Sequence, residues 1–199
     1  MMLTEQTGVP TLALPVQEFK DHLRLGTGFA DDGVQDALAE GYLRAAIAAI
    51  EGRIGKMLIA RDFLLSLSEW RTDDAQAFPV APVSAIGTVN VLDRDGLATL
   101  IGSARYRLQR DTHRPKIVAA GGSLPGIPTG GTVEIAFTAG FGPAWGSVPA
   151  DLAQAVFLLA AQFHENRHEA GERASVLPFG VMALIERWRT VRVLGGGAA

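Results

Sequence analysis

The sequence predicts an α+β protein, in which a helical bundle carries an inserted small antiparallel β-sheet unit at about residues 60–138. Three observations support this fold class. Apolar residues recur at helical spacing over residues 34–57, the pattern then changes to the alternation typical of strands, and a nearly all-apolar helical segment follows residue 149. The chain has 199 residues and 48% of them are hydrophobic, so it can bury a substantial core. We therefore expect a single domain over residues 1–199.

Four helices are expected, near residues 16–25, 32–57, 149–168 and 179–189. The second has the most regular apolar face, built from Leu43, Ile47, Ile50 and Ile54. Asp31-Asp32 precedes it and is expected to cap its positive end. The alanines at 45, 46, 48 and 49 would let a neighbouring element approach closely. Residues 1–14, before the first helix, are expected to be extended and loosely held.

The strand pattern of the middle region is interrupted by turn signals. Strand candidates are Phe63–Trp70, Val83–Leu92, Tyr106–Leu108, Ile117–Val118 and Thr132–Thr138. After the second of these, Asp93-Arg94-Asp95-Gly96 stands between two apolar runs, which predicts a β-hairpin. Residues 121–131 are rich in glycine and proline but lack the Gly-Lys-Ser/Thr of a phosphate-binding P-loop, so a plain loop is expected there.

The composition argues against several classes of protein. A net charge of −3 argues against nucleic-acid binding through a broad basic face. The chain contains no cysteine, which excludes disulfides and cysteine-type zinc sites. The longest apolar run, Ala155–Ala161, is too short to span a bilayer, and the N-terminus lacks the pattern of a secretory signal. We expect no membrane contact and assembly in a cytoplasm.

Residues His164-Glu165-Asn166-Arg167-His168 spell the HExxH signature of zinc proteases on a predicted helix. Histidines four residues apart share a helix face and can both bind zinc, while the glutamate can act as general base on a zinc-bound water. The longer form of the signature requires a third histidine, but that position is Ala174. Glu186 on the following helix is the remaining candidate for a third ligand.

The same residues also fit the polar end of a helix that leaves the core, because Phe163 before them is apolar. A short motif of this kind carries a real risk of chance occurrence. Two hypotheses therefore stand. One is a zinc-dependent metallohydrolase with His164, His168 and Glu186 as ligands and Glu165 as base. The other, which the sequence favours, is a structural protein without enzymatic activity.

Several short blocks follow one another in a distinctive order over about residues 15–190. They are Asp31-Asp32, Ile50-Glu51-Gly52-Arg53-Ile54-Gly55-Lys56, Pro82-Val83-Ser84-Ala85-Ile86, Val91-Leu92-Asp93-Arg94-Asp95-Gly96, Phe137-Thr138-Ala139-Gly140-Phe141-Gly142, Val148-Pro149-Ala150-Asp151-Leu152, Phe163-His164-Glu165-Asn166-Arg167 and Leu177-Pro178-Phe179-Gly180-Val181. Their order and spacing carry the signal, since each block alone is weak. Together they resemble the head–tail connector (adaptor) proteins of long-tailed phages and of phage-like gene transfer agents.

The resemblance implies a ring, commonly a dodecamer, docked under the portal protein at the head–tail junction of a virion or phage-like particle. The ring would continue the DNA channel without sequence-specific binding to DNA, and it would offer a platform to the tail-side stopper or tail terminator protein. It implies no catalysis, no cofactor and no metal. In this family the segment at 163–167 usually is an aromatic residue, a variable residue and then Glu-Asn-Arg. Glu165, Asn166 and Arg167 are therefore expected to be structural residues at a helix end, in ion pairs or interface contacts.

The C-terminal region supplies the candidate interface. Residues 190–199 end in three glycines and two alanines, and they are expected to form a flexible tail unless a partner orders them. Arginine suits contacts between subunits, because its planar guanidinium makes several directed hydrogen bonds. The candidates for contact with the portal or with a neighbouring subunit are Arg187, Trp188, Arg189, Arg192, Val193 and Leu194.

Overall fold

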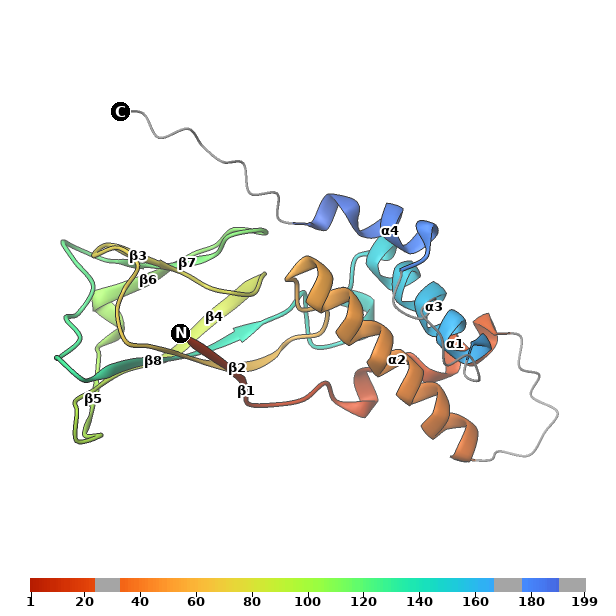
Figure 1. Ribbon diagram of the computed structural model, residues 1–199, viewed down its shortest axis with the longest axis horizontal. Coiled ribbons are helices and arrows are strands. Elements are labelled where there is room, and N and C mark those ends of the chain that lie inside the picture. The colour runs from red at the N-terminus through yellow and green to blue at the C-terminus, as the bar shows by residue number, and fades with distance from the viewer. Residues whose placement is uncertain (24–32, 167–176, 190–199) are drawn as a thin grey trace.

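The computed structural model describes residues 1–23, 33–166 and 177–189, and it separates the chain into a helical part and a sheet part (Figure 1). The helical part holds α1 (Val16–His22), α2 (Gly33–Ile54), α3 (Ala150–Glu165) and α4 (Phe179–Ile185). The sheet part is formed by the region between α2 and α3, together with one strand from the N-terminus. This is the expected α+β fold with an inserted antiparallel sheet unit.

The sheet part contains two antiparallel sheets. The larger has five strands in the order β1-β2-β8-β4-β5 and the smaller has three in the order β3-β7-β6. The strands of the larger sheet are β1 (Met2–Glu5), β2 (Arg61–Leu67), β8 (Thr132–Ala139), β4 (Val83–Leu92) and β5 (Ala98–Leu100). Those of the smaller sheet are β3 (Ala75–Ala77), β7 (Lys116–Ala119) and β6 (Tyr106–Gln109).

A hydrophobic cluster of its own stabilises each part. In the helical part, α3 packs against both α2 and α4, and it buries Leu152, Val156 and Leu159 completely or almost completely. In the sheet part, alternate residues of β2 and β8 point into the second cluster, where the rings of Phe63 and Phe137 stack at 5.6 Å. The two clusters explain why the period of the apolar pattern changes near residue 60.

The two parts meet where residues 55–60, 81–83 and 139–142 run side by side. The Met57 N–H donates to the Ala81 carbonyl at 2.8 Å, and the Ala60 N–H donates to the Gly142 carbonyl at 2.8 Å. Gly140 is required here, because its φ is +138° and a Cβ atom would overlap the backbone of Ile59 and Ala60. This glycine belongs to one of the blocks that carry the family resemblance.

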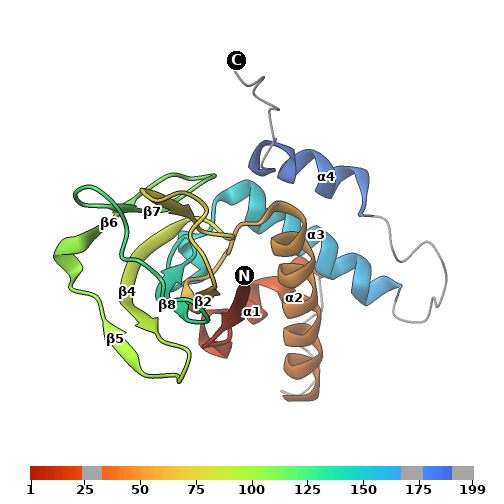
Figure 2. The same ribbon diagram turned by 60° about the vertical axis from the view of Figure 1, so that its left-hand side comes forward.

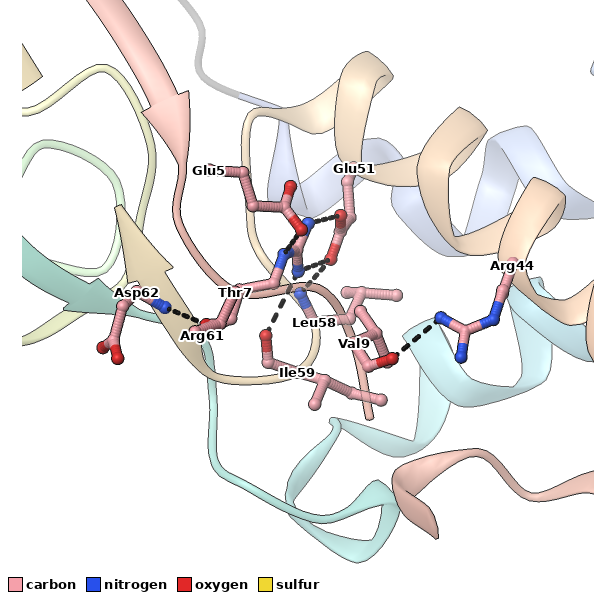
Figure 3. A network of polar contacts seen from close by, with 9 residues as sticks. All are labelled: Glu5, Thr7, Val9, Arg44, Glu51, Leu58, Ile59, Arg61 and Asp62. Atoms are coloured by element: carbon pink, nitrogen blue, oxygen red, sulfur yellow. Dashed lines mark hydrogen bonds and ion pairs between the residues drawn. The ribbon is translucent and has the colours of Figure 1, made fainter. Parts of the chain in front are cut away.

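A buried ion pair crosses this junction (Figure 3). Glu51 near the end of α2 is 4% exposed and Arg61 at the start of β2 is 8% exposed. The Arg61 guanidinium donates to both Glu51 carboxylate oxygens, at 2.6 and 3.0 Å, and to Glu5 of β1 at 2.8 Å. Glu51 also accepts the Leu58 N–H at 2.7 Å. The pair therefore joins α2, β1 and β2 through one set of hydrogen bonds.

Charge pairing outweighs burial at Arg61. Burial alone would lower the pKa of the guanidinium, but the hydrogen bonds from Arg61 to Glu51, and then those to Glu5, hold that pKa above its ordinary value. A second arginine fixes the N-terminal segment further along α2. Arg44 donates to the Val9 carbonyl at 2.8 Å and to the Thr11 hydroxyl at 3.1 Å (Figure 3 draws the first of these bonds).

The expectation that residues 1–14 are loosely held is wrong. Residues 2–5 form β1, which pairs with β2 in a register that sets Leu3 opposite Leu65, and Leu14 is buried. The segment is too short and too mixed in polarity to show the alternation of a strand, so its structure depends on a partner from residues 61–67. The sequence pattern does not predict the three-residue strand β3 for the same reason.

The expected turn is confirmed, and the helices are shorter than expected. Asp93 accepts the N–H groups of Asp95 and Leu97 at 2.9 Å each, Gly96 has φ +83°, and β4 pairs with β5 beyond the turn. The helix expected near 32–57 ends at Ile54, because Gly55 adopts φ +67° and stops it. The helix expected near 179–189 gives way to a 3-10 turn at Glu186–Trp188.

The ends of the other two expected helices also differ from those predicted from the sequence. The one expected near 16–25 ends at His22, and the one expected near 149–168 is described only to Glu165. The proposed cap at Asp31-Asp32 lies outside the described residues. Among the residues that are described, no helix is long and apolar enough to cross a membrane.

Removing the Glu51 carboxylate would leave the buried Arg61 charge with one carboxylate partner among the described residues, the half-exposed Glu5. Glu51→Ala is therefore expected to lower the free energy of unfolding of the full chain by about 3–5 kcal/mol in urea denaturation. The control is Asp95→Ala, because Asp95 and its partner Arg94 have side chains 80% and 79% exposed. That change is expected to cost less than about 1 kcal/mol. Equal losses for the two variants would contradict the role of the buried pair.

Candidate functional site

The HExxH residues lie at the C-terminal end of α3. His164 is half-buried, and its ring meets Tyr42 of α2 edge-on with a centroid distance of 5.7 Å. Glu165 and Asn166 are exposed, and the Asn166 N–H donates to the Gln162 carbonyl at 2.9 Å as the helix ends. Arg167 and His168 lie outside the described residues. The ion pairs or interface contacts expected of Glu165 and Arg167 stay a prediction.

The candidate third ligand, Glu186, lies at the opposite end of α3. The next residue, Arg187, forms an ion pair at 2.7 Å with Asp151, which is in the first turn of α3. The thirteen residues from Asp151 to His164 correspond to about 20 Å of helix at 1.5 Å per residue. Glu186 itself pairs with Arg189 at 3.0 Å. The fold therefore does not bring His164 and Glu186 together.

Asp151 is the centre of a polar cluster that sequence reasoning missed. Its carboxylate accepts the Trp188 indole N–H at 2.7 Å and the Arg187 guanidinium at 2.7 Å, both on the same oxygen. The other oxygen accepts the Leu152 N–H at 3.0 Å. The Trp188 ring also meets Phe141 edge-on at 5.3 Å. The C-terminal segment is thereby attached to the start of α3 and to the segment after β8.

The charge of Asp151 is stabilised by these contacts. Burial alone would raise the pKa of the carboxyl, but the hydrogen bond from Trp188 and the contacts with Arg187 and the Leu152 N–H hold it below its ordinary value. The position at the N-terminus of a 16-residue helix also suits an anion. Asp151 and Phe141 belong to two of the blocks that carry the family resemblance, which is the one signal in the sequence that points to them.

The interface candidates divide into three groups. Trp188 is half-buried and serves as an anchor within the chain. Arg187 and Arg189 remain accessible, with side chains 69% and 41% exposed. Arg192, Val193 and Leu194 lie outside the described residues. Next to the anchor, an open groove of about 420 Å³ runs between the start of α3 and the end of α4, lined by Ala150, Asp151, Ala183, Leu184 and Arg187.

Across residues 1–23, 33–166 and 177–189, no three histidine, aspartate or glutamate side chains lie together as a metal site would require. What the C-terminal end of the described chain offers is a fixed tryptophan, two accessible arginines and a groove. Arginine and tryptophan are enriched at protein interfaces.

Solved structures of related chains identify the family. One chain is 61% identical with a TM-score of 0.89, and it comes from the neck of an empty gene transfer agent (GTA) particle computed with C6 symmetry. A second, 60% identical with a TM-score of 0.86, comes from the virion of a native GTA particle. A third, 56% identical with a TM-score of 0.83, comes from the neck of a native GTA particle computed with C12 symmetry. Each match covers 98% of this chain and 99% of the other.

The fold and these matches define a structural component of a phage-like particle. The chain belongs to the head–tail connector family, in the branch found in the necks of gene transfer agent particles. No protein-family model and no curated protein matches it. The family resemblance inferred from the order of the sequence blocks is confirmed.

Asp151→Asn keeps the shape of the side chain and removes its charge. At pH 7 it is expected to lower the free energy of unfolding by about 1 kcal/mol, from weaker pairing with Arg187 and with the helix N-terminus. Because the pKa of Asp151 is lowered in the folded state, its contribution is complete above the ordinary aspartate pKa of about 3.9 and is lost as the pH falls further.

The measurement is urea denaturation of both proteins at pH 7 and at pH 3. The difference between them should shrink at the lower pH. Asp21→Asn is the control, because among the described residues the Asp21 carboxylate accepts one exposed hydrogen bond, from Gln17. A difference that stays constant with pH would contradict the assignment of this carboxylate as a stabilising charge.

The separation of His164 from Glu186 leads to a prediction about metal. Protein purified without chelators is expected to hold no stoichiometric zinc by plasma mass spectrometry, because a stable zinc site needs at least three protein ligands. The matched variant is the His164→Ala/His168→Ala double substitution, which should leave the metal content unchanged. Stoichiometric zinc that disappears in this variant would restore the metallohydrolase hypothesis.

Proposed function

We propose that this chain is a structural head–tail adaptor that forms a ring between the portal and the tail side of a phage-like particle. The observation that carries the proposal is the 61% identity, over almost the full length of both chains, to a chain from the neck of a GTA particle. A chain this similar in sequence, with a TM-score of 0.89, keeps the same fold. The ring continues the DNA channel and supplies a platform to a tail-side stopper or tail terminator protein.

The symmetry of the related particles supports a ring of identical copies. Their necks were computed with C6 and with C12 symmetry, and a dodecamer satisfies both. A cyclic ring of more than two copies uses two different faces of each subunit, one for each neighbour. A net charge of −3 suits a channel through which DNA slides without being held.

The proposal includes no catalytic step. It is supported by the separation of Glu186 from His164 and by the origin of the three related chains described above, which come from GTA particles or their necks. The HExxH pattern is then the polar end of α3, with Glu165-Asn166-Arg167 as its structural part. No cofactor and no membrane take part in this function.

The C-terminal segment is proposed to contact the portal. Trp188 and Asp151 fix the point at which the chain leaves the helical part, and Arg187 and Arg189 lie beside that point with accessible guanidinium groups. The ten residues that follow, 190–199, include Arg192, Val193 and Leu194. An anchored base followed by a glycine-rich end suits a segment that reaches across to a second protein.

The test is to delete the gene in a cell that produces the particles and to count particles by electron microscopy. Without this chain, DNA-filled heads and separate tails are expected, and a plasmid copy of the gene should restore tailed particles. Tailed particles at the normal frequency in the deletion strain would contradict an adaptor function. A second plasmid encodes residues 1–189 only and tests the C-terminal segment. It should yield a soluble protein that no longer sediments with heads, while unchanged sedimentation would rule out that segment as the portal contact.

A further inference from the structure

The surface formed by α3 and α4 exposes large apolar side chains. Phe179 at the start of α4 is 89% exposed and Leu158 in the middle of α3 is 36% exposed. Gly180 lies against Leu158, and Ala183 continues the same side of α4 to the groove beside Arg187. We call these four residues, Leu158, Phe179, Gly180 and Ala183, the α3–α4 face. A phenylalanine ring this exposed to water does not gain the free energy that its burial would provide.

The outer side of α2 is uncharged along most of its length. Leu38, Gly41, Ala45, Ala48 and Gly52 follow at spacings of three and four residues, and all are exposed. We call these residues the α2 face. Its leucine is 49% exposed, and none of the five residues carries a charge or a polar side chain. An ordinary solvent-facing side of a 22-residue helix carries charged residues instead.

The glycines of α2 point to close approach by another element. A Cβ atom at Gly41 or Gly52 would meet no described atom within 4 Å, so no contact within the described part of the chain requires glycine there. Glycine within a helix lowers its stability compared with alanine. A partner that approaches the α2 backbone closely would explain the choice, because glycine and alanine let helices pack at short distances.

The two faces point in different directions from the helical part. α3 packs against α2 on one side and against α4 on the other (Figure 2). His164, which contacts Tyr42 of α2, and Leu158, which borders α4, are six residues apart and therefore about 120° apart around the α3 axis. The α2 face is the side of α2 turned away from the core. One face can therefore belong to each neighbour in a ring.

We propose that the α2 face of one copy packs against the α3–α4 face of the next copy, with Phe179 as the central contact. This inference rests on the proposed ring and names the surfaces that close it. Phe179 provides the projecting ring, and the alanines and glycines of α2 provide a shallow surface without charges that would have to be desolvated. Two different faces that fit each other produce a cyclic chain of contacts, whereas a face that fits itself stops at a dimer.

The test uses the absence of cysteine from the natural sequence. Phe179→Cys and Ala45→Cys are combined in one chain, and particles assembled with it are treated with a short bis-maleimide. A denaturing gel should show a ladder of covalent multimers from the double variant and monomers from each single variant. The matched control pairs Ala45→Cys with Leu97→Cys, because Leu97 is also exposed but lies at the turn between β4 and β5. It should give no ladder.

The outcomes separate this inference from the proposed function. Particles that contain the double variant but yield only monomers overturn the pairing of faces and leave the adaptor function intact. Dimers from a single-cysteine variant overturn it too, because they show like faces in contact. If the chain is absent from wild-type particles, the proposed function itself has failed.

A second variant keeps the test decisive if the cysteine proteins do not assemble. Gly41→Leu adds a side chain that the isolated chain has room for, so thermal unfolding of the subunit should be unchanged or shifted upward. In the ring the same side chain blocks the approach of α4, and tailed particles should fall by about tenfold or more. Gly102→Leu, at an equally open position in the sheet part, is the control. A normal yield of tailed particles with Gly41→Leu overturns the proposal.

Discussion

The ion pair between Glu51 and Arg61 is the interaction on which the arrangement of the two parts depends. Two charges taken out of water are costly unless every polar atom finds a partner. Here the carboxylate receives both guanidinium bonds and the Leu58 N–H, while the remaining guanidinium N–H groups reach Glu5 and the Ile59 carbonyl. All of these bonds depend on the relative placement of α2, β1 and β2. The pair therefore favours this orientation, whereas the two apolar clusters supply most of the stability.

Elements with a regular local pattern could be predicted from the sequence. Structure that depends on pairing between distant residues could not. The apolar spacing of α2, the alternation of β8 and the Asp-Gly turn are local signals, and each led to the correct element. β1 is formed by four residues whose only regular feature is their pairing with β2. Glu51 and Arg61 look like ordinary surface charges in the sequence. Nothing in their neighbours shows that the chain folds them into the junction.

The candidate site shows the same limit. The HExxH residues form a conspicuous pattern, but the pattern is local and could not reveal that Glu186 lies at the other end of α3. The contact between Asp151 and Trp188 joins residues 37 positions apart, and no spacing rule connects an aspartate with a tryptophan. Only the order of the family blocks drew attention to Asp151 and Phe141. The contacts at this site depend on how the chain folds, and the residue types alone do not predict them.

The junction also has a mechanical meaning. The ion pair and the backbone bonds around Gly140 attach the sheet part to α2, so they hold the two parts in one relative orientation. In the proposed ring, the angle between neighbouring copies would set the curvature, and therefore the inner diameter. A small rotation between the helical parts of two copies would then also move their sheet parts. The inner diameter of the proposed ring would therefore depend on the buried pair of Glu51 and Arg61.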